Sequence, residues 1–166
     1  MTRTAMVFTI SDSSHAGSRQ DISGPAVRAR LEELGWTVNS EVMPDDAVWI
    51  SKRLAEVADG GDAAAIFTTG GTGVALRDVT PEATNAVIER EIPGFGEWMR
   101  MSGRASTKTS ILSRGVSGTR GRTLIVNLPG SPRGAVESLN AIIELVPHVM
   151  DLLRGKTEHY EVEPKL

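Results

Sequence analysis

The chain has 166 residues, 40% of them hydrophobic, and a net charge of −3 at neutral pH, which fits one domain with a hydrophobic core. It has no cysteine, which excludes disulfides, zinc thiolate sites and thiol nucleophiles. The acidic balance argues against nucleic-acid binding, and no apolar run reaches the roughly 20 residues of a membrane span. Because Met1–Ile10 also has too short an apolar core for a signal peptide, we expect a cytoplasmic protein.

The first half of the chain alternates strands with helices. The predicted strands are Met6–Ile10, Trp36–Met43 and Ala63–Phe67. One predicted helix opens at Ser23, and a second is capped by the Pro44–Asp46 turn. Apolar residues at i, i+4 and i+7 give each helix one buried face, made of Val27, Leu31 and Leu34 in the first and of Ile50, Leu54 and Val57 in the second.

The second half continues this pattern and adds a hairpin. We expect a helix over residues 81–90 with Thr80 as its N-cap, and a short helix that ends at Met101. The pattern of residues 112–122 predicts a hairpin centred on Gly118, which feeds the strand Thr123–Leu128. Two further helices follow, one with Ser131 as N-cap and Pro132 at its first position, the other over residues 147–153.

This alternation predicts an α/β fold: a three-layer α/β/α domain with a mostly parallel sheet and one hairpin that adds an antiparallel strand. We expect the domain to span residues 1–155. Residues 156–166 form a polar tail.

A glycine loop, Thr68–Gly73, directly follows the third predicted strand, and Asp78 and a helix start follow the loop. Glycines let backbone N–H groups approach phosphate oxygens, and a helix N-terminus adds partial positive charge. A tight turn without a ligand explains the glycines equally well, although Asp78 favours a site.

Four loops meet at one edge of the predicted sheet, because ligands of such sheets bind beyond the carboxyl ends of the strands. Each contains glycine, proline, hydroxyls or acids; they are Ser11–Gly17, Pro44–Asp46, Gly70–Asp78 and Pro129–Pro132. This convergence is the strongest physical argument for a binding site.

Charge is unevenly distributed along the chain. No acid lies between Glu97 and Glu137, where seven bases are found: Arg100, Arg104, Lys108, Arg114, Arg120, Arg122 and Arg133. The first half supplies Asp12, Asp21, Asp45, Asp46 and Asp78. A solvated basic face is one interpretation. The other is a metal–polyphosphate site, in which acids hold the cation and bases face the phosphates.

Several nucleotide and hydrolase motifs are missing. No lysine follows Gly73, which disfavours a P-loop NTPase, and the first strand-to-helix turn lacks the Gly-x-Gly-x-x-Gly pattern of dinucleotide-binding folds. The Gly-x-Ser-x-Gly pattern of serine hydrolases is also missing.

Longer motifs resemble one family over almost the whole chain to about Leu153. They are the residues 11–25 segment, Thr69–Gly73 followed by Arg77–Thr84, Ile92–Glu97, Leu112–Arg114 and Arg120–Pro132. In this order they resemble the Mog/MoaB family of molybdenum-cofactor biosynthesis proteins. The resemblance implies transfer of AMP from ATP to the terminal phosphate of molybdopterin with Mg²⁺, in a homotrimer.

The resemblance also implies a set of site residues. Asp45 and Asp78 would be catalytic and would position Mg²⁺. Substrate binding would involve Ser11, Asp12, Asp21, Gly70, Gly71, Thr72, Gly73, Ser113, Asn127, Pro129, Gly130 and Ser131.

Alternatives remain within the family. Some members have the fold without clear adenylylation activity, so a non-catalytic molybdopterin-binding or scaffold protein is the main rival. Molybdate-insertion enzymes, which we expect as transient partners, typically have Val-Ser after the two glycines, whereas this chain has Thr72-Gly73.

Overall fold

The computed structural model describes residues 3–156 and contains one six-stranded sheet of order β2-β1-β3-β6-β5-β4. The strands are β1 (Arg3–Ile10), β2 (Trp36–Met43), β3 (Ala65–Thr69), β4 (Arg90–Glu91), β5 (Ser117–Arg120) and β6 (Thr123–Leu128). β2, β1, β3 and β6 run parallel, whereas β5 is antiparallel to both of its neighbours. The predicted mostly parallel sheet with one antiparallel strand is confirmed.

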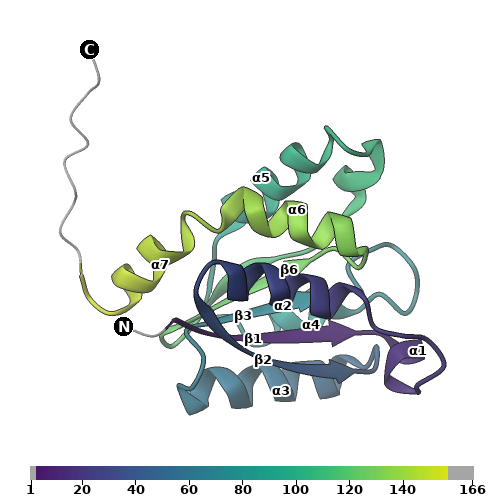
Figure 1. Cartoon of the computed structure of the whole chain (residues 1–166). Helices are drawn as coiled ribbons and strands as arrows, with labels where there is room; N and C mark the ends of the chain where they lie inside the picture. Colours follow the sequence, from purple (N-terminus) through teal and green to yellow (C-terminus); the bar gives the residue numbers. More distant parts are fainter. Residues whose placement is uncertain (1–2, 157–166) are drawn as a thin grey trace.

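Helices cover both faces of the sheet (Figure 1). They are α1 (Asp12–His15), α2 (Ser23–Glu33), α3 (Ala47–Gly60), α4 (Thr80–Asn85), α5 (Pro93–Gly103), the 3₁₀ helix η1 (Lys108–Leu112), α6 (Pro132–Ile142) and α7 (Val146–Leu153). None of the helices within residues 3–156 is long and apolar enough to cross a membrane.

Two apolar clusters join the three layers, because successive side chains of a strand point to opposite faces. In β1, Ala5 and Val7 pack with α2, α5, α6 and α7 on one face. Met6, Phe8 and Ile10 pack with α3 and α4 on the other face. The core therefore fixes the parallel strands, and with them the loops at their carboxyl ends.

The N-caps of two helices are confirmed. The Asp46 side chain accepts a hydrogen bond from the Trp49 N–H at the start of α3, and Ser131 does the same for the Gly134 N–H at the start of α6. Thr80 is not an N-cap: Val79 has that position, and the Thr80 hydroxyl donates to the Gly70 carbonyl instead. Tertiary contact with the glycine loop thus replaces local capping.

Three expected elements differ from the structure. The hairpin turns at Gly121, between β5 and β6, so Gly118 lies within a strand rather than at its centre. The helix expected to reach Arg90 ends at Asn85. Arg90 instead lies in β4 and pairs with Thr119 of β5. The polar loop after β1 contains the short helix α1, capped by Ser11. Most of the expected polar tail, residues 157–166, lies outside the described residues.

Candidate active site

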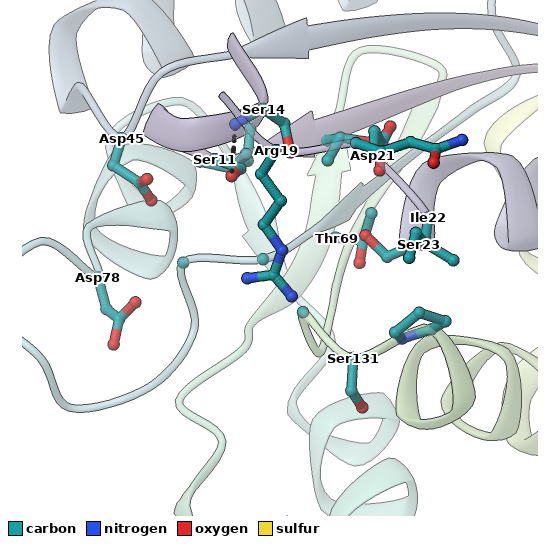
Figure 2. Close-up of a pocket in the computed structure, with 17 residues that line it drawn as sticks. Ser11, Ser14, Arg19, Asp21, Ile22, Ser23, Asp45, Thr69, Asp78 and Ser131 are labelled. Atoms are coloured by element: carbon teal, nitrogen blue, oxygen red, sulfur yellow. Dashed lines mark hydrogen bonds between the residues drawn. The ribbon is translucent and has the colours of Figure 1, made fainter. Parts of the chain in front are cut away.

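A cavity of about 500 Å³ lies at the carboxyl ends of the parallel strands (Figure 2). All four predicted loops contribute to it, through Ser11, Asp45, Gly70, Gly71, Gly130 and Ser131 among others. The predicted convergence is therefore confirmed. The size is within the usual range for a small-molecule site.

The glycine loop packs its backbone directly against neighbouring chain. Gly70 and Gly71 have φ angles of 101° and 66°, in the region that favours glycine. A Cβ atom on Gly70 would lie 2.3 Å from the Ile10 carbonyl oxygen, and one on Gly71 would lie 2.3 Å from the Thr80 hydroxyl. The loop can therefore approach β1 and the start of α4 only because these two positions are glycine.

Asp45 and Asp12 join the loops after β2 and β1, because each carboxylate accepts a hydrogen bond from the other residue's backbone N–H. The Asp12 N–H donates to Asp45 Oδ2, and the Asp45 N–H donates to Asp12 Oδ1, each at 2.9 Å. Only Asp45 lines the cavity. Burial raises the pKa of the Asp45 carboxyl above its ordinary value, and the charges of Asp12 and Asp78 contribute further, against the opposing effect of the Asp12 N–H.

Asp12 is turned outward and pairs with Arg77. The Arg77 guanidinium donates through Nη2 at 2.6 Å and through Nε at 2.9 Å to Asp12 Oδ2. This bond, together with the N–H of Asp45, lowers the pKa of the Asp12 carboxyl. Asp12 therefore ties the extended glycine loop to α1 and does not itself line the cavity.

Asp78 lines the cavity from the end of the glycine-loop segment. Its Oδ2 accepts a hydrogen bond from the Ala75 N–H at 2.9 Å. Arg114 holds the segment from behind, since it donates to the Gly73 carbonyl and to the Asp78 carbonyl, each at 2.7 Å, and pairs with Glu82. The Ala75 N–H thus holds the Asp78 carboxylate, and Arg114 holds the main chain of Asp78.

A second cavity of about 340 Å³ lies across the Gly130–Ser131 turn, and these two residues line both cavities. Thr72, Gly73, Ser113 and Pro129 line only the second cavity of these two. Its other hydroxyl-bearing residues are Thr107, Thr109, Ser110 and Ser138. The predicted binding residues therefore divide between two adjoining spaces.

Two of the predicted residues support the site more than they face it. Asn127 is 1% exposed, and its amide donates to the hydroxyls of Thr68 and Thr84 and accepts from the Val116 N–H. Asp21 lines the first cavity, yet both of its carboxylate oxygens accept bonds from the protein, one from the Thr9 hydroxyl and one from the Gly24 N–H.

The basic segment is used mainly for structure. Arg114, Arg120 and Arg133 form ion pairs with Glu82, Asp59 and Glu137. Arg100 donates to two backbone carbonyls. None of the seven bases lines either cavity, so the expectation that this segment faces a bound polyanion is not met by the side chains that line them.

Sequence reasoning missed the residues that close the first cavity. Arg19, Gln20 and Ile22 line it from the segment between α1 and α2, and Ser23 lines it from the start of α2. No periodicity marks this segment, although it directly follows the polar loop after β1. Figure 2 shows Arg19 extending across the cavity, with its guanidinium directed toward Ser131.

Comparisons with known proteins show the family of the chain. The family described as "Probable molybdopterin binding domain" matches residues 6–148. A molybdopterin adenylyltransferase of Helicobacter pylori is 40% identical over 154 residues, covering 90% of this chain and 86% of the relative. One from Escherichia coli K12 is 39% identical over 164 residues, with 90% and 84% covered.

A solved structure gives the same result for the fold. The molybdopterin biosynthesis enzyme MoaB from Thermus thermophilus has a TM-score of 0.86 and 46% identity, over 93% of this chain and 98% of that one. With the family match over residues 6–148, the chain therefore belongs to the molybdopterin-binding-domain family that contains the Mog and MoaB proteins.

Proposed function

We propose that the chain is a molybdopterin adenylyltransferase, which transfers AMP from ATP to the terminal phosphate of molybdopterin. The observation that carries the proposal is the pair of adjoining cavities that share the Gly130–Ser131 turn. Two substrates must lie side by side for this reaction, and relatives about 40% identical over most of their length are named for it.

The chemistry asks for positioning more than for a strong base. An oxygen of the molybdopterin phosphate, already anionic at neutral pH, attacks the α-phosphorus of ATP. The new bond is P–O, the bond from the α-phosphorus to the bridging β-oxygen breaks, and pyrophosphate leaves with the electron pair. The glycine-loop backbone and the Thr72 hydroxyl would hold phosphate oxygens while this occurs.

Asp45 and Asp78 fit a magnesium ion, because their carboxylates line the same cavity and each provides the oxygen ligands that Mg²⁺ prefers. Residues 3–156 contain no cluster of three or more acidic or histidine side chains suited to a metal. Mg²⁺ commonly uses one or two carboxylates together with water and substrate phosphates, and Asp45 and Asp78 would provide the two carboxylates. When bound, the ion would offset phosphate charge.

The proposal includes a cellular setting. We propose a homotrimer in the cytoplasm, which passes adenylylated molybdopterin to a molybdate-insertion enzyme through a transient contact.

The direct test is to incubate the pure protein with ATP, Mg²⁺ and molybdopterin and to measure pyrophosphate. We expect release that requires both substrates. Saturable molybdopterin binding without pyrophosphate would contradict the proposal and favour the non-catalytic binding protein.

Asp78→Asn tests the residue on which the proposal depends most. The amide oxygen of Asn can still accept the Ala75 N–H bond, so the loop keeps its shape, whereas the charge is lost. We expect kcat to fall at least about 10²-fold with the affinity for ATP largely kept. Asp62→Asn removes an exposed charge away from both cavities and serves as the control. Near-normal turnover of Asp78→Asn would rule out a catalytic role for Asp78.

A further inference from the structure

Arg19 is the one cationic side chain that lines the first cavity, among the residues that the structure describes. Asp21, Asp45 and Asp78 line it as well. A cavity that takes substrates with several phosphates needs positive charge in addition to carboxylates, and the basic segment does not provide it here.

The backbone that carries Arg19 is firmly held. The Ser13 carbonyl accepts three hydrogen bonds, from the Ser18 N–H at 3.0 Å, the Arg19 N–H at 3.2 Å and the Ser18 hydroxyl at 3.1 Å. Two residues further on, Asp21 is fixed by the Thr9 hydroxyl at 2.7 Å. Arg19 therefore projects from a short segment that is anchored on both sides.

Its guanidinium is free of acidic partners within residues 3–156, unlike those of the arginines nearby. Arg77 is paired with Asp12, and Arg114 is paired with Glu82. These two arginines stabilise the glycine-loop segment, and each directs donors to its acidic partner. Arg19 forms no ion pair there and extends toward Ser131, so its five N–H donors remain available to a ligand.

We propose that Arg19 binds phosphate oxygens of a substrate in the first cavity and so positions the reacting groups. The inference rests on the proposed function and adds a residue that it does not assign. A guanidinium presents a planar fork that matches two phosphate oxygens at once, and its charge offsets the repulsion between two polyanions. The ligand chemistry is a phosphate group, from either the triphosphate of ATP or the monophosphate of molybdopterin.

Arg19→Ala and Arg19→Lys test the inference, with Arg122→Ala as a matched control. Arg122 is also exposed, but it lies at the turn before β6, at the opposite end of that strand from the cavity. We expect Arg19→Ala to raise one KM at least about 10-fold, since bonds between charged groups are lost. Arg19→Lys keeps the charge without the fork and should be intermediate. All three variants should keep the wild-type Tm.

The two KM values separate the sources of phosphate. A rise in the KM for ATP assigns Arg19 to the triphosphate, and a rise in the KM for molybdopterin assigns it to the monophosphate. If the wild type releases pyrophosphate and Arg19→Ala stays within twofold of it in both KM values and in kcat, the inference is wrong and the proposed function stands.

Calorimetric titration with Mg·ATP and with molybdopterin distinguishes a failure of the proposed function from a failure of the role of Arg19. If the wild type makes no pyrophosphate yet binds either compound, and Arg19→Ala alone loses that affinity, the proposed function fails and the role of Arg19 stands. If the wild type binds neither compound, both fail.

Discussion

Asp45 occupies a position that is unfavourable for an ionised carboxylate. It is half-buried, and the charges of Asp12 and Asp78 are close enough to raise its pKa further. The folded chain therefore holds a proton on Asp45 more tightly than the unfolded chain does. Stability then falls as the pH rises from the ordinary value of 3.8 through the raised pKa.

Asp45→Asn should consequently stabilise the protein and impair it as an enzyme. At pH 7 we expect a higher Tm, because the substitution removes a disfavoured charge while the amide oxygen can still accept the Asp12 N–H bond. The gain should shrink as the pH is lowered toward 3.8. Turnover should fall at least about 10-fold. Thermal unfolding across this pH range checks the first part, and a lower Tm at pH 7 would contradict it.

Residues that line a cavity could be predicted where the residue type stands out locally in the sequence, and not where tertiary contacts decide which way a residue faces. Asp78 and the Gly130–Ser131 turn stand out in the sequence and line a cavity. Asn127 carries the same kind of signal, a polar residue in an apolar strand, yet its amide completes a buried network with two threonines. Arg19 lacks any local signal, since only the tertiary path after α1 brings it over the cavity.

Because the glycine loop is tightly packed, we expect Gly→Ala substitutions to destabilise the protein to different degrees at different elements. Gly70→Ala puts a Cβ atom 2.3 Å from a backbone oxygen at a φ of 101°, and should destabilise by about 2 kcal/mol or more. Gly35→Ala, with φ at 82° in open space, should cost only about 1 kcal/mol.

Gly94→Ala is the matched control for these two. Gly94 lies in α5 with no atom near its added Cβ, so the change should be neutral or stabilise by about 0.5 kcal/mol. Urea unfolding of the three variants gives the order. Equal stabilities for Gly70→Ala and Gly94→Ala would show that the loop can rearrange.

The positions of helices and strands could be predicted where the apolar residues follow a single pattern. The stripe of α3 at Ile50 and Leu54 and the apolar run of β6 are both buried as expected. The hairpin was misplaced because two glycines compete, and Gly121 rather than Gly118 has the positive φ that the turn requires. Gly118 is instead needed in β5, where a Cβ would lie 2.6 Å from the Arg90 carbonyl oxygen.

For the whole molecule, apolar side chains remain exposed on α5 and η1, which contact each other. Trp98 and Met101 on α5 and Ile111 and Leu112 on η1 are each more than half exposed. A surface of this kind often marks a protein interface. We therefore expect the proposed homotrimer to form through it.

Light scattering should give three times the 17.8 kDa of one chain for the wild type. Met101→Glu should shift the mass toward that of a single chain, because it places a charge in the expected interface. Val48→Glu changes an equally apolar but separate site on α3, 80% exposed, and should leave the mass unchanged. A monomeric wild type would contradict the trimer, and a trimeric Met101→Glu would contradict this interface.

The contact between Gly130 and Gly70 limits how this site can diverge in evolution. Gly130 lines both cavities, and a Cβ atom on it would lie 3.2 Å from the Gly70 Cα. The turn between the two cavities therefore has little room for a larger residue at this position. Substitutions can therefore hardly reshape this turn, and we expect new selectivity to arise at side chains that line the cavities elsewhere. Arg19 and Ile22 line the first cavity with side chains, and Val74 and Leu112 line the second, so divergence within the family should concentrate at such positions.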